Sequence, residues 1–577
     1  MKKHIYIGLF AVLAVFGLQG CVQDLKVESI DPNTSSTIEA KNLFMKIYST
    51  LALTGQKGPD GIGDVAGVDE GTSSFYRMIH ELQEFPADQI YWIWPDVGVD
   101  DIRKMTWTAS NSLLKGLYSR LYFDITLCNL YLDDYADIAT KEELAEVRFI
   151  RALNYYYLLD MFGNVPHVLH AGLADLPEQI MRPDLYNWLK TELVEEIEPN
   201  LAPAGQRMSY YRIDQAAAWL LLSRLCLNAE VYGKDRNGVQ QIADLKKEYT
   251  DAAFYANQVI ASSYTLASKY TYLFMGDNDG LSAVNDAKNE IILPIAQDGI
   301  ETRSWGGALY LIASCNTGGM PPTGSTENWK CIRSRAQLVG LFSDKFQSPV
   351  ADAITTEAAA KKAYGEFFGT AKEITAAAKD DRALFCNYSS DGTNTYCCQF
   401  WKTNKGDEFL SGWGITKFTN LMADPARIAS DTQHPDMDLP FMRAAEAYLN
   451  YAEAVLRGGE QCGMTVDDAV NEVRKRANAE PKTGWNLTDT PLKGLNILDE
   501  RGREFYCEGM RRSDLIRFGY FTGSAAESGY RWEYKGGELL GIKAAPEKFR
   551  TLYPLPLSEV TANTNLEQNP GYEVNVQ

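Results

Sequence analysis

The sequence has 577 residues and a formal net charge of −20, and 45% of its residues are hydrophobic. Such a negative charge argues against nucleic acid or an anionic lipid surface as a partner, because phosphates and acidic headgroups repel it. The chain is long enough for one large hydrophobic core or for two to three smaller ones. Aromatic residues are the compositional excess, with 32 Tyr, 23 Phe and 11 Trp.

The first twenty residues have the pattern of an export signal. Two lysines precede an apolar run over residues 5–18, which is too short to span a membrane comfortably. The run ends in Leu-Gln-Gly-Cys, which resembles a bacterial lipobox. We therefore expect a signal peptide over residues 1–20, lipid attachment at Cys21 and a polar tether over residues 21–36. An ordinary signal peptide followed by an incidental cysteine is the alternative.

Cysteine spacing gives little sign of a disulfide framework. Ten cysteines occur, so nine remain when Cys21 is set aside. They are scattered, and Cys397-Cys398 is the only close pair in the sequence. A disulfide-dense scaffold is therefore not expected, although one or two bridges stay open for an exported protein.

The first half of the chain carries repeated helical patterns. Residues 145–163 place apolar side chains at three- and four-residue steps, and a glycine and a proline end the pattern. Residues 214–233 begin at a cap-type Asp214, and residues 249–264 repeat the same mixture of alanine and aromatic side chains. Small residues with aromatic rings between them resemble the paired helices of tetratricopeptide-type repeats. Because no strict repeat period is visible, an irregular α bundle is the alternative.

The middle of the chain, residues 265–438, is rich in Gly, Asn, Asp, Ser and Pro. Within it, residues 291–299 predict a short buried strand. Residues 303–330 predict a long loop with a tryptophan near each end. Loops this long inside a compact domain are functional or disordered, and the tryptophans favour a function.

Helical patterns resume at residues 439–459, where apolar side chains share one face and two glycines end the segment. Residues 465–478 begin with a threonine and, three positions later, an aspartate, a pairing typical of a helix cap. A charged helical segment follows over residues 497–521. Residues 552–572 hold too many Pro and Asn for regular structure.

Four of these segments together resemble the recurring signatures of the SusD/RagB family of outer-membrane nutrient-binding lipoproteins. They occur in the order that the family has them. The segments are RALNYYYLLDMFGNVP (151–166), RAAEAYLNYAEA (443–454), LDERGREFYCEGMRRSDLIRFG (498–519) and LYPLPLSEV with NTNLEQNPGY (552–572).

The resemblance implies a fold, a location and a partner. The fold is mostly α, a SusD-like fold with tetratricopeptide-like helix pairs and a loop-rich ligand-binding subdomain. The protein would be anchored by its lipid at the outer membrane, on the cell surface. It would act with a SusC-like TonB-dependent transporter and would not be an enzyme. The expected parts of a single domain over 37–577 are a helical-pair scaffold at about 37–264 and 439–521, a loop-rich part at about 265–438 and an irregular C-terminal part at 522–577.

The charged residues of the signatures have a structural interpretation. Arg443 and Glu446 lie one turn apart on a predicted helix, and Glu504, Arg512 and Asp514 lie where helix ends must be joined. Ion pairs and caps at helix junctions explain these positions better than catalysis does. We therefore expect the ligand site elsewhere.

A sugar ring suggests which residues could form that site. A pyranose is apolar on its C–H faces and hydroxylated at its rim, so aromatic rings cover a face while amides, carboxylates and guanidinium groups bond to the rim. A curved array of rings can select a helical glycan, and an α-glucan such as starch is the first guess. The positions that the resemblance suggests are Trp107, Asn111, Trp305 and Trp329, with Tyr310 as a further ring and Arg77 as a weaker rim donor.

The stretch Tyr-Trp-Ile-Trp at residues 91–94 adds two candidates, Trp92 and Trp94. If this stretch is extended, both indoles point to the same side, because side chains alternate along a strand. Two neighbouring prolines can instead anchor a loop through these rings, so one of the two indoles is expected to be packed. Packing in the core is the alternative for every tryptophan.

Metal and cofactor signals are weak. The sequence Asp-Asn-Asp-Gly at 277–280 begins like a calcium loop but lacks the acidic residue at its end, so a turn is preferred. A structural calcium held by Asp277 or Asp279 together with Asp436 or Asp438 stays open for this family. No cofactor is required, and neither a zinc pattern, a phosphate-binding loop nor a serine nucleophile motif is present.

Three function classes remain. The first is a non-catalytic surface lipoprotein that captures a glycan and delivers it to the transporter. The second is a RagB-like protein that binds peptide or glycoconjugate, for which small polar residues would dominate the site. The third is an extracellular glycoside hydrolase, which needs two carboxylates across a cleft. The loop tryptophans favour the first class.

Overall fold

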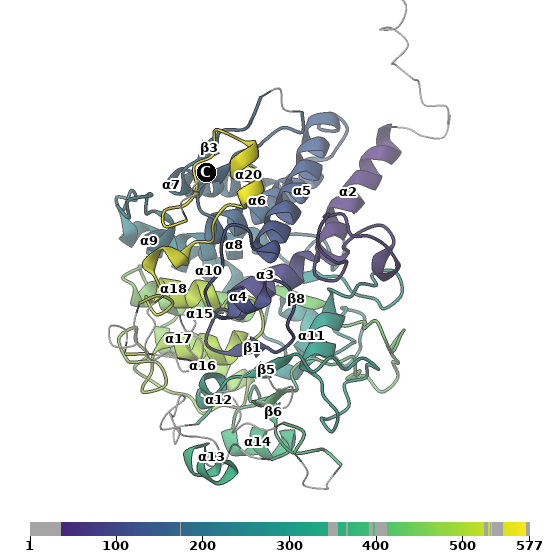
Figure 1. Cartoon of the computed structure of the whole chain (residues 1–577), viewed down its shortest axis with the longest axis vertical. Coiled ribbons are helices and arrows are strands. Elements are labelled where there is room, and N and C mark those ends of the chain that lie inside the picture. Colours follow the sequence, from purple (N-terminus) through teal and green to yellow (C-terminus); the bar gives the residue numbers. More distant parts are fainter. Residues whose placement is uncertain are drawn as a thin grey trace, which may run out of the picture.

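The computed structural model describes residues 36–172, 175–343, 356–364, 367, 369–391, 396–398, 412–523, 529–530, 532 and 546–572. Within them the chain is mostly helical, as expected (Figure 1). The helices are α2 (Ser36–Ala52), α3 (Phe75–Glu84), α4 (Val99–Arg103), α5 (Ser112–Asp134), α6 (Lys141–Met161), α7 (Arg182–Thr191), α8 (Gln215–Leu227), α9 (Ala229–Tyr232), α10 (Leu245–Ile260), α11 (Ala308–Cys315), α12 (Ala336–Gly340), α13 (Glu357–Tyr364), α14 (Ala371–Ala378), α15 (Ala444–Leu456), α16 (Val466–Arg476), α17 (Ile497–Phe505), α18 (Arg511–Arg517) and α20 (Leu557–Ala562). The predictions for the signal peptide and for lipid attachment at Cys21 fall outside the described residues.

The helices pack as successive neighbours. Helix α5 lies against α6, α8 against α10, α10 against α15, and α15 against α16. Small residues allow the close approach of α8 and α10, because Ala217 and Ala218 on one helix and Ala252 and Ala256 on the other are fully buried. Segments that are distant in the sequence therefore join one helical scaffold, in agreement with the predicted helix pairs.

Side-chain caps fix where several helices begin. Asp214 accepts a hydrogen bond from the backbone of Ala216 at the start of α8, and Thr465 and Asp468 form a reciprocal capping box at the start of α16. Both caps were predicted from the sequence and are confirmed. Thr140 and Glu143 form a second capping box on α6.

Short strands join in antiparallel pairs. The strands are β1 (Ile90–Trp92), β2 (Val165–Pro166), β3 (Gln179–Ile180), β4 (Ile291–Ile295), β5 (Ile332–Ser334), β6 (Phe385–Cys386), β7 (Gly414–Ile415) and β8 (Leu439–Arg443). They pair as β1 with β5, β2 with β3, β4 with β8 and β6 with β7. Strand β4 is fully buried, as predicted for residues 291–299. Strands β1, β5 and β6 lie in the lower half of Figure 1, and helices α5 and α6 lie in its upper half.

Three predictions of secondary structure were wrong. Residues 552–572, expected to lack regular structure, contain helix α20. The helix expected at residues 439–459 begins only at Ala444, because the five residues before it form β8 and pair with β4. The loop expected at residues 303–330 contains helix α11. Every residue of α11 is buried, so the helix is apolar all round and shows no amphipathic period in the sequence.

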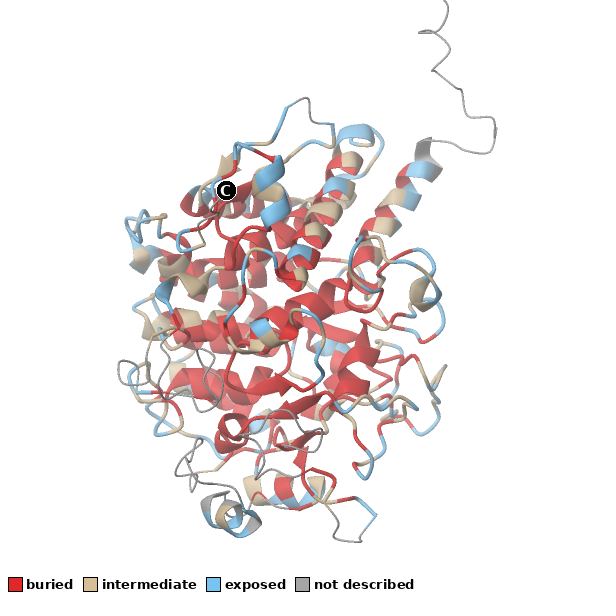
Figure 2. Cartoon of the chain, in the orientation of Figure 1, coloured by how far each residue is buried: buried red, intermediate tan, exposed pale blue. Residues whose placement is uncertain are grey.

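The signature residues lie in buried ion pairs, as their structural interpretation predicted. Arg443 contacts Glu504 at 2.6 Å, Glu290 at 2.9 Å and Glu508 at 2.8 Å. Arg512 contacts Asp160 at 3.1 Å. Figure 2 shows that the helices around these residues are buried almost throughout.

Among the residues that the structure describes, no helix combines the length and the apolar character that a membrane span needs.

Candidate functional site

The stretch around Trp92 divides into a packed part and a presented part. Strand β1 ends at Trp92, which is 3% exposed. Its ring stacks on Tyr310 at a centroid distance of 5.9 Å and packs against Phe85 at 5.4 Å, and its indole nitrogen donates to Asp96 at 3.1 Å. Trp92 and Tyr310 are therefore core residues, and their predicted role in a sugar site was wrong.

Trp94 has the opposite environment. It lies in a bend after the strand, so the alternation that would have placed both indoles on one side no longer applies. Its side chain is 45% exposed, and its indole nitrogen donates to the backbone carbonyl of Trp329 at 2.9 Å. The expectation that one of the two indoles is packed is confirmed.

Trp107 and Asn111 have structural positions. Trp107 is 1% exposed, donates to the hydroxyl of Tyr572 at 2.7 Å and packs edge-on against Tyr553. Asn111 caps helix α5, accepting from the backbone of Leu113 at 3.0 Å. A buried ring presents no face to a ligand, and the amide is occupied by the backbone. The prediction of these two residues as a sugar-binding pair was wrong.

Arg77 lies beneath the surface, next to the packed rings. Its guanidinium lies over Tyr310 at 4.8 Å and pairs with Glu81 at 2.8 Å. It lines a cavity of about 540 Å³ together with Glu81 and Asp96. Because its charge is matched by Glu81, Arg77 serves first as an internal ion-pair partner and not as an exposed rim donor.

Trp305 and Trp329 come together with Trp94, and we call these three residues the tryptophan cluster. The Trp305 and Trp329 rings are half-buried, 6.3 Å apart and inclined by 42°. Trp94 joins them through its hydrogen bond to Trp329. The structure thus brings together three of the predicted rings, from sites far apart along the chain.

Polar side chains surround the tryptophan cluster. Glu327 accepts from the indole nitrogen of Trp329 at 3.0 Å and from the amide of Gln433 at 3.0 Å. Glu70 accepts from the backbone nitrogen of Trp305 at 3.1 Å. These bonds fix the two rings while carboxylate and amide groups remain beside them.

A cavity of about 380 Å³, here called the polar groove, is lined mainly by the segment that directly precedes Trp329 in the sequence. Its walls consist of glycines, polar residues, two prolines and one methionine from the segment 316–328, together with Thr432. The backbone nitrogen of Thr326 bonds to the carbonyl of Thr432 at 2.8 Å, which joins the two walls. The groove offers hydroxyl, amide and backbone groups to a ligand that lies on the rings.

His434 is a member of the site that sequence reasoning missed. Its ring lies 5.4 Å from that of Trp305. Burial lowers the pKa of His434 below its usual value, in spite of the nearby Asp431, so the imidazole is neutral at pH 7. No motif marks His434, because only the fold brings it to Trp305.

Comparison with known proteins agrees with this architecture. The family model described as the SusD family matches residues 289–572. The chain is 38% identical to the starch-binding protein SusD of Bacteroides thetaiotaomicron, over 99% of both chains. The chain belongs to the SusD family.

Solved structures resemble this SusD-family chain in fold. Surface glycan-binding protein A from Bacteroides uniformis superposes with a TM-score of 0.64 at 18% identity, covering 93% of this chain and 100% of the other. The protein of the same name from Bacteroides thetaiotaomicron, in complex with laminarihexaose, gives 0.61 at 20% identity, with 92% and 99% covered. The SusD-like fold expected from the sequence signatures is confirmed.

The four aspartates considered for calcium divide into two kinds in this SusD-family member. Asp277 accepts from Ser282 and from the backbone of Asp424, and Asp279 is paired with Arg427 at 2.6 Å. Their oxygens are thus already used. By contrast, Oδ1 of Asp436 and Oδ2 of Asp438 are buried without a hydrogen bond of normal geometry.

The charge of Asp438 is poorly compensated. Burial and the nearby carboxylates of Asp279 and Asp298 raise its pKa well above the usual range. Calcium in proteins takes six to eight oxygen ligands. Asp436 and Asp438 each keep one oxygen without a hydrogen bond of normal geometry, whereas Asp277 and Asp279 could act as ligands only by giving up their present partners.

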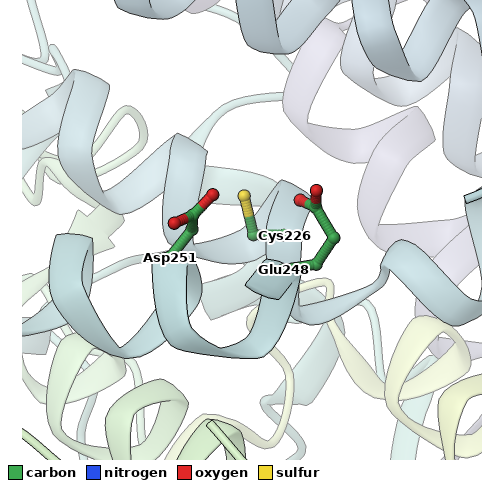
Figure 3. Close-up of side chains that lie close together, drawn as sticks. All are labelled: Cys226, Glu248 and Asp251. Carbon is green, nitrogen blue, oxygen red and sulfur yellow. The ribbon is translucent and has the colours of Figure 1, made fainter. Parts of the chain in front are cut away.

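One group of three potential metal ligands converges in the described part of the chain. Cys226, Glu248 and Asp251 point toward one another from α8 and α10 (Figure 3). The ammonium of Lys190 lies 2.5 Å from Glu248 and 2.8 Å from Asp251. The two carboxylates are therefore neutralised by a lysine, so the group is an ion pair between helices and not a metal centre.

Proposed function

We propose that this SusD-family chain is a non-catalytic glycan-binding lipoprotein of the cell surface. It captures an α-glucan of the starch type and delivers it to a SusC-like TonB-dependent transporter. The single observation that carries the proposal is the tryptophan cluster, in which Trp94, Trp305 and Trp329 meet at the surface beside a polar groove.

The exposure of these rings supports a ligand. Trp94 remains 45% exposed although its indole nitrogen is held by the Trp329 carbonyl. Single exposed apolar residues are common, but adjacent indoles surrounded by polar groups are typical of a binding surface. Sugar rings would cover the indole faces with their C–H bonds, while Glu327 and Gln433 are placed to bond hydroxyl groups at the rim.

The inclination of the rings favours a curved glycan. Trp305 and Trp329 meet at 42°, so they cannot both lie flat on a straight, ribbon-like chain. Successive glucose units of a helical α-glucan turn relative to one another and can follow such an angle. The 38% identical relative named as a starch-binding protein supports the same choice. A β-glucan is the second candidate, because the fold relative solved with laminarihexaose binds one.

Affinity electrophoresis tests the proposal. The body of the chain from residue 22 is run through native gels that contain amylopectin, laminarin or no polysaccharide. Trp94→Ala, Trp305→Ala and Trp329→Ala are compared with Trp219→Ala, a half-buried tryptophan of the scaffold helix α8. We expect retardation in amylopectin that the three cluster variants lose and the control keeps.

Each other outcome has a defined meaning. Retardation in laminarin alone would replace the α-glucan by a β-glucan. No retardation in either gel would move the proposal to the peptide or glycoconjugate class. Release of shorter sugars from amylopectin by the purified protein would contradict the non-catalytic role.

The anchor and the partner need separate experiments. The full chain is expected to incorporate labelled palmitate in a Gram-negative host, and Cys21→Ala is expected to abolish the label. Crosslinking in intact cells should capture a TonB-dependent transporter. Absence of the label would favour an ordinary signal peptide.

A further inference from the structure

Four sulfur-containing side chains form a small buried cluster apart from the main core. They are Met320, Cys386, Cys397 and Cys398, and we call them the sulfur cluster. The sulfur atoms of Cys386 and Cys397 lie 3.8 Å apart. All three cysteines are buried, between 0% and 3% exposed.

The backbone explains why Cys386 and Cys397 meet. Residues 386 and 397 lie on two arms of a hairpin, in which Tyr388 and Tyr396 form an antiparallel bridge. The carbonyl of Asn387 accepts from the backbone nitrogens of both Cys397 and Cys398, at 2.8 and 3.1 Å. Two residues thus oppose one, as in a β-bulge, which changes where the side chains of that arm point. The bulge aims Cys397 at the sulfur of Cys386.

We propose that Cys386 and Cys397 form a disulfide in the exported protein, while Cys398 keeps its thiol. In this step each of the two thiols loses its hydrogen and one S–S bond forms. A disulfide-bearing oxidant of the thiol-oxidase class accepts the two electrons and two protons and becomes a dithiol. A disulfide has a length of about 2.05 Å, so the two sulfur atoms must approach by rotation of their side chains.

The surroundings decide when the bond forms. Cys397 is enclosed, and its hydrogen bond to Cys386 together with burial raises its pKa to about 12. A buried protonated thiol is a poor nucleophile, because the thiolate is the reactive form. The bond must therefore form before the hairpin closes, during folding in an oxidising compartment. The export signal expected at residues 1–20 would bring the chain to such a compartment.

The bond would stabilise a wall of the polar groove, and this consequence rests on the proposed function. Ser390, on the same hairpin, donates its backbone N–H to the carbonyl of Gly319 at 2.8 Å. Gly319 has φ +91° and lies so close to Cys397 that a Cβ there would be 3.2 Å from the Cys397 Cβ. Gly319 also lines the polar groove. The hairpin thus supports the loop that borders the tryptophan cluster.

Mass spectrometry tests the bond without any glycan. The full chain is expressed with its own leader, exported, denatured and alkylated without reductant. One tryptic peptide spans residues 383–402 and holds all three cysteines of the cluster, so we expect a single alkylation on it, at Cys398. Chymotryptic cleavage after Tyr388 and Tyr396 then separates Cys386 from Cys397 in sequence, and the two fragments should stay joined until reductant is added.

Three results would overturn the proposal. Alkylation of all three cysteines would show free thiols. A bond between Cys397 and Cys398 would stay inside one chymotryptic fragment. A soft metal ion retained in the native mass spectrum, with three alkylations after denaturation, would make the cluster a thiolate site instead.

Stability measurements add an independent readout. Cys386→Ser and Cys397→Ser should lower the melting temperature equally, and the double variant should fall no further. Reductant present during unfolding should lower the melting temperature of wild type to that of the variants. Cys462→Ser replaces a half-buried cysteine outside the cluster and is the matched control: without reductant it should melt like wild type, and with reductant it should fall as far as wild type does. Additive losses in the double variant would contradict a shared bond. If the bond is found but amylopectin is not bound, only the proposed function fails.

Discussion

The indole nitrogen of Trp94 donates a hydrogen bond of 2.9 Å to the backbone carbonyl of Trp329, across 235 positions of sequence. The bond ties the exposed indole of Trp94 to the backbone of Trp329 and so fixes where this ring lies before a ligand arrives. Ordering this side chain in advance lowers the entropic cost of binding.

Replacement of Trp94 tests this geometry. Covering one ring face with sugar contributes about 1.5 kcal/mol at the usual value per buried area, so Trp94→Ala should weaken amylopectin binding about tenfold. Trp94→Phe should lose less affinity, because it keeps an apolar ring face. It should still bind more weakly than wild type, because it lacks the N–H donor. Isothermal titration with a maltooligosaccharide provides the measurement. Wild-type affinity in Trp94→Ala would remove this ring from the site.

Asn111 should affect stability and not binding. Its side chain accepts from the backbone nitrogens of Leu113 and Leu114, so Asn111→Ala should lower the free energy of unfolding by about 1 kcal/mol through loss of the cap. Urea unfolding measures the loss, and the retardation in amylopectin gels should be unchanged. Weaker binding at unaltered stability would restore Asn111 to the ligand site.

Glu504 makes the protein sensitive to acid. Burial alone would raise the pKa of this carboxyl, but Arg476, Arg443 and Arg382 outweigh it and lower the pKa to about 2. The folded pKa lies below the unfolded one, so the stability is present above about pH 4.5 and is lost as the pH falls toward 2.

The variant Glu504→Gln isolates this contribution. At pH 7 the free energy of unfolding of this variant should be lower than that of wild type by about 3 kcal/mol or more, because the variant leaves buried guanidinium groups without their carboxylate. Its remaining stability should decline less than that of wild type between pH 5 and pH 2.5. Thermal unfolding at each pH measures the stability of both proteins. If the two stabilities decline in parallel, other groups cause the acid sensitivity.

Glu84 should make the protein less stable as the pH rises, which is the opposite of the effect of Glu504. Burial raises its pKa to about 7, although the backbone N–H groups of Met510 and Gly509 oppose this shift. The pKa of Glu84 is higher in the folded protein than in the unfolded chain. Its contribution to stability is therefore present at low pH and is lost as the pH rises through 7. Glu84→Gln should therefore gain stability relative to wild type at pH 8 and show little difference at pH 5. Urea midpoints at the two pH values measure this, and an equal difference at both would contradict it.

Calcium binding remains a prediction, and of the four aspartates considered for it, Asp436 and Asp438 are the two with an oxygen that no hydrogen bond of normal geometry uses. Because binding to the folded state alone stabilises a protein, millimolar calcium should raise the melting temperature, and chelator should reverse the effect. Asp436→Asn and Asp438→Asn should remove the response, whereas Asp277→Asn should lower stability with and without calcium. Magnesium is the ionic-strength control. A response that survives both amide variants would place the ion elsewhere.

The fold could be predicted from the sequence more completely than the site could. Caps such as Asp214 and the Thr465–Asp468 pair act within a few residues, so the sequence contains all that determines them. Helix α11 was missed because burial on every side removes the amphipathic period. Strand β8 was missed because only its pairing with β4 makes it extended.

The site depended on which rings are buried, and that is a property of the whole fold. Trp92 and Trp94 are two residues apart, yet one packs on Tyr310 and the other is presented at the surface. Trp107 has a polar context in the sequence, but Tyr553 and Tyr572 cover it from the far end of the chain. Composition identified tryptophan as the relevant residue type, while long-range packing chose among the tryptophans.

The ion pairs of Arg443 also constrain the order of folding. Its carboxylate partners are Glu290, Glu504 and Glu508, which lie on both sides of it in the sequence. A chain still being synthesised has no Glu504 or Glu508 to offer, so Arg443 must stay hydrated until the last quarter has been made. Burying it earlier would leave it with Glu290 as the one partner of these three, and without the two carboxylates that complete its pairing in the core, which is unfavourable. The junction thus closes late, and a chain that ends before residue 504 cannot complete it.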